Sequence, residues 1–550
     1  MADGGGWRGL IAEAEPVGLS LAGADLAGPS PLEGPAEVEA LRALGHRMVD
    51  DALDGYAAMS DGAAAGPVWR PMPDALRASF RSDPLPRAGG GSAEAAYADY
   101  RARVAPHAVG NRHPRFLGWV HGGGTALGAL ADLAAAGLNA NLGGRDHAPV
   151  EVEREVVRWS AEVLGMPPGA SGLLTSGASM ANLVGVLVAR ERALGPWGVR
   201  AGGVAAAVAA SGRGRLVAYA SEAAHLCVGR ALDLAGLGSD ALRLVPADAA
   251  GRVRVDRLSG MLEADRAAGL RPFLVVGTAG AVDTGAVDDL GALADLCARE
   301  GDLWFHVDAA IGGAAVLSPA LRDLFGGIGR ADSVAFDWHK LAGVPYEAGC
   351  VVVRDAAAHR AAFARDPGGS ASYLRSGAAE GGGDAGGRSR GLAGSAGEPW
   401  PVDLGPELSR GFRALKVWLS LKAYGADRIG AAAERCCALA RRLGEAVAAE
   451  PALEPLAPVA LNVVVFRHRA LGDAGQEALA AGLQEAGGPV LSTTRVPTWD
   501  GGERGPARVA LRACFANHRA GAADADAVVP AVLAAAASMT TAGRAGGGAA

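Results

Sequence analysis

The chain has 550 residues, half of them hydrophobic, and carries a formal net charge of −7. This length suits one large domain with smaller appendages, and the apolar content excludes a globally disordered chain. The mild acidity disfavours nucleic-acid binding, no basic block indicates a membrane anchor, and we find no apolar run of the roughly 18 residues that span a bilayer.

Lysine is almost absent from the sequence. Of the 52 basic residues only Lys340, Lys416 and Lys422 are lysine, so each is a candidate for a task that requires a primary amine. Six cysteines are scattered without a C-x-x-C pair, which indicates reduced thiols and no metal site. No signal peptide is visible at the N-terminus, and we therefore expect a cytoplasmic protein.

The first segment with a regular pattern begins near residue 36. Residues 1–35 are rich in Ala, Gly, Pro and acidic side chains, which predicts a disordered tail. Val38, Leu41, Leu44 and Met48 then recur at helical spacing and predict an amphipathic helix. This helix opens an N-terminal helical segment over residues 36–110.

Short apolar runs alternate with helical segments between about residues 115 and 355. A predicted helix, Leu290–Arg299, lies between the apolar runs Phe273–Thr278 and Leu303–Val307, with Asp288 or Asp289 as its N-cap. This order is typical of βαβ units and predicts an α/β domain over 111–404 with a mostly parallel sheet. The predicted strands are Leu216–Ala220, Phe273–Thr278, Leu303–Val307, Ser333–Phe336 and Cys350–Val353.

The last part of the chain predicts a second, smaller domain. Residues 377–396 are nearly all Gly, Ala, Ser and charged residues and indicate a mobile loop within about 366–400. A long helix over Arg410–Tyr424 and strands over Leu461–Phe466 and Arg508–Cys514 then predict a C-terminal α+β domain over 405–535. We expect residues 536–550 to form another disordered tail.

Lys340 is the first candidate for chemistry. It follows the predicted strand Ser333–Phe336 closely, and ligands of open α/β sheets bind at the carboxyl ends of strands. An amine in such a pocket can lose its proton and attack a carbonyl. A plain surface lysine is the alternative, which the rarity of lysine in this chain disfavours. Lys416 and Lys422 share one predicted helix, and we expect structural roles for both.

Two further patterns are compatible with a phosphorylated, planar cofactor. Asp308 follows the strand Leu303–Val307, where its carboxylate could pair with the ring nitrogen of pyridoxal phosphate or cap the next segment. The turn before the apolar helix Leu183–Val188 could bind a phosphate through Ser176, Ala178 and Ser179, although such a turn is more often only a helix cap.

Three histidines lie near these residues. His225 follows a predicted strand and could stack on a planar cofactor, although a lone histidine is more often structural. His306 is two residues from Asp308 and shares its face of the strand. His339 precedes Lys340 and could contact a phosphate. The order of these residues along the chain is more informative than any one of them.

That order resembles the fold-type I, pyridoxal-phosphate-dependent group II amino-acid decarboxylases, the family of aromatic-L-amino-acid decarboxylase. The similarity extends from about Val38 to about Arg519. The segment His306–Ala310, followed by His339-Lys340, is its most specific part. The segments that carry the resemblance are His113–Phe116, Thr175–Ser179, Ser221–His225, Gly277-Thr278, His306–Ala310, Asp332–Lys340 and Leu415–Trp418.

The resemblance implies a role for each site residue. Lys340 would hold the cofactor covalently, Asp308 would pair with the ring nitrogen and His225 would stack on the ring. Tyr373 would protonate the substrate carbon from a mobile loop. The remaining contacts would be made to the phosphate by Ala178, Ser179 and His339, and near the ring by Thr278 and Ala310.

The resemblance also implies the reaction and the assembly. A small L-amino acid, most often an aromatic one, would lose carbon dioxide in a homodimer whose N-terminal segment packs on the partner. An aldehyde synthase on the same scaffold is one alternative, which in this family goes with Phe in place of Tyr373 or Asn in place of His225. A non-catalytic binding protein is another, and it would be expected to lose Lys340 or Asp308.

Two positions depart from the animal members of this family. Asp337 stands where they have Asn beside the phosphate, so its carboxylate needs a hydrogen-bond donor or must turn away. Val120-His121 replaces a Phe-Pro pair that shapes the substrate pocket. The identity of the substrate therefore does not follow from the resemblance.

Overall fold

The computed structural model describes residues 35–60, 66–87, 91–364, 399–500 and 503–546. The predicted tail over residues 1–35 lies outside this part of the chain, apart from Pro35. So does most of the predicted loop, including Tyr373. The division into domains at residues 110 and 404 stays a prediction.

A seven-stranded sheet forms the centre of the large domain. The sequence predicted its mostly parallel pairing and five of its strands. Its order is β1-β7-β6-β5-β4-β2-β3, with parallel pairing from β3 to β6. Only β7 is antiparallel to its neighbours, β6 and β1. The strands are β1 (Ser171–Thr175), β2 (Leu216–Ser221), β3 (Leu242–Val245), β4 (Arg271–Thr278), β5 (Trp304–Ala309), β6 (Ser333–Asp337) and β7 (Gly349–Val353).

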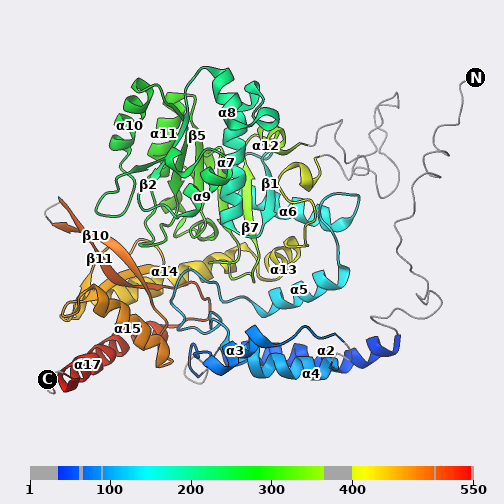
Figure 1. Cartoon of the computed structure of the whole chain (residues 1–550), viewed down its shortest axis with the longest axis vertical. Coiled ribbons are helices and arrows are strands. Elements are labelled where there is room, and N and C mark those ends of the chain that lie inside the picture. The colour runs from blue at the N-terminus through cyan, green and yellow to red at the C-terminus, as the bar shows by residue number, and fades with distance from the viewer. Residues whose placement is uncertain (1–34, 61–65, 88–90, 365–398, 501–502, 547–550) are drawn as a thin grey trace, which may run out of the picture.

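Helices cover both faces of this sheet, so the domain has three layers (Figure 1). Alternate residues of the buried strands belong to two separate apolar clusters, one with each helix layer. One layer contains α7 (Ala178–Leu194), α8 (Val199–Ser211), α9 (Cys227–Leu234) and α12 (Ala356–Phe363). The other contains α6 (Ala148–Val163), α10 (Val255–Ala267) and α11 (Leu290–Glu300).

The start of α11 decides between the two predicted caps. Asp289 is the N-cap, since its carboxylate accepts the N–H of Ala292 at 2.9 Å. Asp288 is buried and accepts the backbone N–H groups of Val253 and Thr278 instead. It therefore ties the end of β4 to the loop before α10.

The C-terminal region has a four-stranded antiparallel sheet in the order β10-β11-β9-β8. Both predicted strands are present in it, with shifted ends. The strands are β8 (Leu453–Pro455), β9 (Val463–His468), β10 (Ser492–Asp500) and β11 (Glu503–Cys514). Its helices are α13 (Ala414–Tyr424), α14 (Ala426–Ala449), α15 (Asp473–Glu485), α16 (Ala522–Asp526) and α17 (Val528–Gly546).

The helix predicted from Arg410 begins four positions later, at Ala414. Arg410 is buried, and its guanidinium forms an ion pair with Glu153 of α6 at 2.5 Å. Its backbone N–H donates to the side chain of Asn141. These tertiary contacts hold residue 410 outside the helix, and local spacing does not reveal them.

The C-terminal tail prediction is wrong for residues 536–546, because α17 continues to Gly546. Val528, Val532 and Ala536 are buried at a spacing of four residues, and the helix packs on α14 and α15. The segment Ala522–Met539 is also long and apolar enough, by length and composition, to cross a membrane. No continuous apolar run of this length is visible in the sequence, because polar and small residues interrupt the apolar ones.

The N-terminal helices lie beside one another, away from the seven-stranded sheet (Figure 1). Val38, Met48 and Leu53 on α2 are 50%, 45% and 37% exposed, whereas Leu44 is buried. The predicted helix is thus present, with most of its apolar face uncovered in a single chain. The N-terminal helices are α2 (Pro35–Ala58), α3 (Asp74–Ser82) and α4 (Ala93–Asp99), and α2 packs on α5 (Ala126–Leu138), which also contacts α13.

Candidate active site

A cavity of about 620 Å³ lies where the parallel strands β2, β4, β5 and β6 end. Ligands of open α/β sheets bind at this edge, because loops and helix N-termini converge there. Residues of β10 and β11 close the cavity from the C-terminal region. Every predicted site residue in the described part of the chain lines it: Ala178, Ser179, His225, Thr278, Asp308, Ala310, His339 and Lys340.

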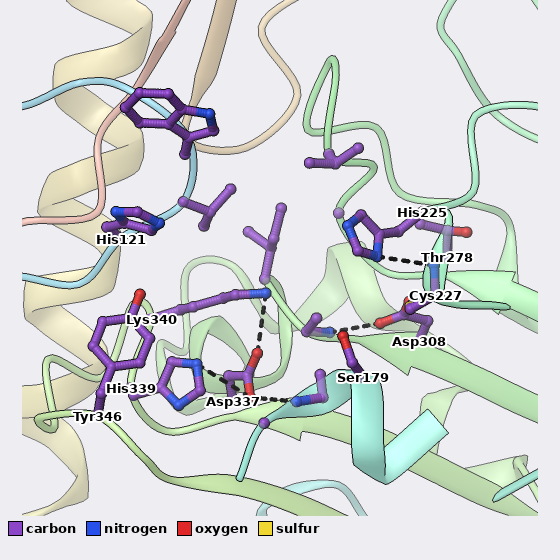
Figure 2. Close-up of a pocket in the computed structure, with 18 of the residues that line it drawn as sticks. His121, Ser179, His225, Cys227, Thr278, Asp308, Asp337, His339, Lys340 and Tyr346 are labelled. Carbon is purple, nitrogen blue, oxygen red and sulfur yellow. Dashed lines mark hydrogen bonds and ion pairs between the residues drawn. The ribbon is translucent and has the colours of Figure 1, made fainter. Parts of the chain in front are cut away.

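Lys340 follows β6 by three residues and points its amine into the cavity (Figure 2). Its Nζ lies 3.0 Å from Oδ2 of Asp337. Burial disfavours the ammonium form, but the Asp337 and Asp308 carboxylates outweigh it, so the pKa of Lys340 is raised. Without a cofactor the amine is therefore protonated, and it must lose this proton before it can act as a nucleophile.

Asp337 has the hydrogen-bond donors that an acid at this position needs. Its Oδ1 accepts the backbone N–H of Ala178 at 2.7 Å and lies 3.5 Å from Nε2 of His339. With Lys340, three groups predicted to bind the cofactor thus contact Asp337 (Figure 2). The departure from Asn places a carboxylate at the N-terminus of α7, where a phosphate would be held.

Asp308 is the penultimate residue of β5, and its side chain is buried. Its Oδ1 accepts the N–H of Ala310 at 3.1 Å, and Cys227 Sγ lies 3.8 Å from its Oδ2. The next helical turn begins at Gly313 with Gly312 as its N-cap. Asp308 therefore does not cap a helix, although its carboxylate holds the backbone of the turn that follows β5. Burial raises the pKa of Asp308, and Lys340 opposes that effect.

His225 lies beyond β2, on the same side of the cavity as Asp308 (Figure 2). Its Nδ1 accepts the backbone N–H of Cys227 at 3.3 Å, which orients the ring. Burial lowers the pKa of His225, so the imidazole is neutral near pH 7. A neutral ring held in this way can stack on a flat ligand.

Two buried polar atoms on the cavity wall have no partner in the described part of the chain. They are Oγ1 of Thr278 and Nη2 of Arg512. Unpaired buried donors are costly, and in native proteins they often indicate a ligand. The other guanidinium nitrogens of Arg512 donate to the carbonyls of Val282 and Trp119, at 2.7 and 2.9 Å. These contacts fix the guanidinium at the cavity.

Sequence reasoning missed Arg512. Arginine is so common in this chain that no single arginine stands out. Its place on the predicted strand Arg508–Cys514 was visible, but nothing local indicates that this strand reaches the cavity. Only the packing of the C-terminal sheet against the large domain brings it there.

One wall of the cavity is aromatic. Trp119 and His121 line it, and their ring centroids lie 5.8 Å apart. The buried ring of Phe116 stacks on both from behind, with centroids 5.7 and 6.0 Å away. Tyr346 lies edge-on to His121 and 4.3 Å from the ring of His339. The altered Val120-His121 pair, singled out in the sequence, therefore belongs to this wall. Tyr346 was not anticipated.

The donor set fits pyridoxal phosphate. An amine, a buried carboxylate and a neutral imidazole surround the cavity, and the N-terminus of α7 opens at its base. The unpaired hydroxyl of Thr278 and the guanidinium of Arg512 supply further polar contacts. The amine matches the aldehyde of the cofactor, the carboxylate its ring nitrogen and the imidazole its planar ring. The helix N-terminus, the hydroxyl and the guanidinium match anionic groups.

The chain is similar to known proteins that use pyridoxal phosphate. The pyridoxal-dependent decarboxylase conserved domain matches residues 89–469. An aromatic-L-amino-acid decarboxylase of Bacillus atrophaeus is 32% identical, over 65% of this chain and 68% of its own length. An L-2,4-diaminobutyrate decarboxylase of Rhizobium meliloti (strain 1021) is 30% identical, over 75% of this chain and 77% of its own length.

The fold comparison covers nearly the whole chain. The crystal structure of Oryza sativa TDC with PLP and tryptamine superposes with a TM-score of 0.78 at 25% identity, covering 93% of this chain and all of that one. The family domain spans most of this chain, and the lysine, aspartate and histidine that carried the resemblance meet at one cavity. The chain therefore belongs to the pyridoxal-dependent decarboxylases, which use pyridoxal phosphate to remove carbon dioxide from an amino acid.

Proposed function

We propose that this enzyme converts an aromatic L-amino acid to its amine and carbon dioxide. The observation that carries this proposal is the aromatic wall of Trp119, His121 and Tyr346 beside the reactive groups. Aromatic side chains pack favourably on such a surface. The relative from Bacillus atrophaeus is named for aromatic substrates.

In this proposal each polar residue holds or moves charge at a defined atom. Bound pyridoxal phosphate supplies an electron sink for the pair of electrons left at the substrate Cα when carbon dioxide leaves. Asp308 keeps the ring nitrogen protonated, and His225 holds the ring from one face. Arg512 offers its unpaired Nη2 to a carboxylate. Tyr373, which lies outside the described residues, returns a proton to Cα.

A basic substrate is the second candidate. Asp283 and Glu347 also line the cavity, and their carboxylates could pair with a side-chain ammonium group. The relative from Rhizobium meliloti is named for L-2,4-diaminobutyrate. An aldehyde synthase is favoured less, since the sequence keeps both Tyr373 and His225. A non-catalytic binding protein is disfavoured by the presence of Lys340 and Asp308.

A substrate panel tests these alternatives. The purified enzyme, supplied with pyridoxal phosphate, is given L-tryptophan, L-tyrosine, L-phenylalanine and L-2,4-diaminobutyrate, and the release of carbon dioxide is measured with that of hydrogen peroxide. We expect release from an aromatic amino acid without peroxide. Preference for diaminobutyrate would overturn the aromatic assignment, and stoichiometric peroxide would identify an aldehyde synthase.

We also propose that the enzyme is a cytoplasmic homodimer. The uncovered apolar residues of α2 support self-association, because they would be buried by a second copy. The six cysteines are all free and buried, which is compatible with a reducing compartment. Analytical ultracentrifugation measures the mass of the assembly, and a monomer at micromolar concentration would contradict the dimer.

A further inference from the structure

A buried thiol lies next to the carboxylate that is proposed to hold the cofactor ring. Cys227 begins α9, is 5% exposed and lines the cavity. Its Sγ lies 3.8 Å from Oδ2 of Asp308. Nothing in the proposed decarboxylation uses this thiol, which makes its position worth explaining.

The thiol is the end of a chain of hydrogen-bonded, buried polar side chains that begins on β5. Trp304 and His306 lie on this strand at alternate positions with Asp308, so all three side chains share one face. The indole Nε1 of Trp304 donates to Oγ of Ser333 at 2.8 Å. The same Oγ lies 2.7 Å from Nδ1 of His306.

Asn182 of helix α7 connects these groups to Cys227 at the cavity. Nε2 of His306 lies 2.7 Å from Oδ1 of Asn182 on this helix. The amide Nδ2 of Asn182 donates to Sγ of Cys227 at 3.4 Å, and Cys227 reaches Asp308. Five consecutive contacts therefore connect the indole of Trp304 to the carboxylate of Asp308.

Only one placement of the hydrogens makes every contact a hydrogen bond. An ionised Asp308 can only accept, so the Cys227 thiol donates to it, and the sulfur accepts from the Asn182 amide. The amide oxygen then accepts from Nε2–H of His306. Burial lowers the pKa of His306 to about 4, so the ring is neutral and its Nδ1 accepts from the Ser333 hydroxyl. That hydroxyl in turn accepts from an indole, which can only donate.

We propose that Cys227 is a positioning residue for Asp308: its thiol is the last donor of a one-way hydrogen-bond chain that holds this carboxylate in place for the cofactor ring nitrogen. The proposal rests on the proposed pairing of Asp308 with that nitrogen. The N–H of Ala310 holds the other carboxylate oxygen. With both oxygens held, the carboxylate cannot rotate, and each oxygen keeps a lone pair for the ring.

The thiol is suited to donate rather than to attack. Burial raises the pKa of Cys227 to about 12, and the nearby Asp308 carboxylate adds to this effect. A thiol that keeps its proton is not a nucleophile at neutral pH. A hydrogen bond from it stabilises the ionised form of Asp308, which burial alone disfavours.

The test compares two substitutions that differ in the donor. Cys227→Ser keeps a donor at the same place, and Cys227→Ala removes it. Cys297→Ala is the matched control, because Cys297 is a buried thiol on α11 that does not line the cavity. The dissociation constant for pyridoxal phosphate is measured on each apoenzyme. Solid-state NMR of holoenzyme loaded with ¹⁵N-labelled cofactor reports protonation of the ring nitrogen.

We expect Cys227→Ala to weaken cofactor binding about three- to tenfold, the range of one lost hydrogen bond, and to shift the ¹⁵N resonance toward the unprotonated form. Cys227→Ser should stay within about twofold of the wild type. Equal behaviour of Cys227→Ala and Cys297→Ala would overturn the proposal. Equal losses in Cys227→Ser and Cys227→Ala would overturn it as well, since packing and not donation would then matter.

A further variant separates this proposal from the role of Asp308. Asp308→Asn should weaken cofactor binding and shift the ¹⁵N resonance more than any Cys227 variant does. Unchanged cofactor binding and an unchanged ¹⁵N resonance in Asp308→Asn would contradict the pairing of Asp308 with the ring nitrogen. A strong effect in Asp308→Asn with none in Cys227→Ala would overturn only the role of Cys227. Calorimetric unfolding of each apoenzyme shows whether the variants fold equally well.

Discussion

At the scale of single residues, the rarity of lysine identified Lys340 as a candidate, and the fold places two carboxylates near its amine. Lys340 was selected because lysine is rare in this chain, and it lines the cavity beside Asp337 and Asp308. The contact between Cys227 and Asp308 could not be predicted, because 81 residues separate the two. Tertiary contacts of this kind become visible only once the strands are placed.

The first prediction concerns the amine. Lys340→Ala should abolish the visible absorbance of covalently held cofactor and reduce decarboxylation more than about a thousandfold, because no other described amine lines the cavity. Absorption spectra and carbon dioxide release measure both effects. Lys422→Ala is the control, since that ammonium group lies over Trp159 and Trp418 on the outside of the domain. Retained covalent absorbance in Lys340→Ala would contradict the assignment.

The second prediction concerns the acid beside the amine. Asp337 raises the pKa of Lys340, so Asp337→Asn should lower that pKa and leave more amine unprotonated at a given pH. The pH profile of cofactor capture by the apoenzyme should then move to lower pH. Loss of a negative charge at the N-terminus of α7 should also tighten cofactor binding about three- to tenfold.

Stopped-flow absorbance across a pH series measures this capture. Asp526→Asn is the matched control, because Asp526 forms an exposed ion pair with Arg442 and neither residue lines the cavity. A profile that stays in place, or that moves to higher pH, would contradict the proposed interaction between Asp337 and Lys340.

At the scale of elements, the sequence predicted the almost fully buried strands of the large sheet and missed the partly exposed ones. β4, β5 and β6 are almost entirely buried and contain mostly apolar residues, and all three were anticipated. β1 contains a glycine, and β3 has only four residues with an arginine among them. Such segments become strands because they pair with a neighbour, β7 for β1 and β2 for β3. The local sequence pattern does not predict this pairing.

The third prediction tests how closely α7 packs on the sheet. A Cβ added at Gly185 would lie 2.7 Å from Cε1 of the His306 ring, so Gly185→Ala should lower the free energy of unfolding by about 1–3 kcal/mol. Gly482→Ala on α15 is the matched control, since nothing lies within 4 Å of its added Cβ. Because alanine favours helix, this control should gain up to about 1 kcal/mol.

Denaturant titration of the two apoenzymes measures both changes. Similar stabilities for Gly185→Ala and Gly482→Ala would contradict the close packing of α7 against β5. A loss confined to Gly185→Ala would also show that the ring of His306 has no room to move aside. Helix and strand would then hold the hydrogen-bond chain to Asp308 in one fixed arrangement.

At the scale of the whole molecule, the uncovered face of α2 decides the last prediction. Val38 and Met48 are about half exposed on a helix whose spacing predicted an apolar stripe. If a second copy covers this stripe, Val38→Glu with Met48→Glu should place unpaired charges in the interface and dissociate the dimer. Sedimentation velocity would then give the mass of a single chain, and Leu234→Glu, at a residue of α9 that is 65% exposed, should leave the mass unchanged. A variant that keeps the wild-type mass would show that α2 lies outside the interface. Loss of cofactor binding together with the dimer would show that the site needs both chains, whereas a monomer that still binds cofactor would confine the site to the residues of one chain.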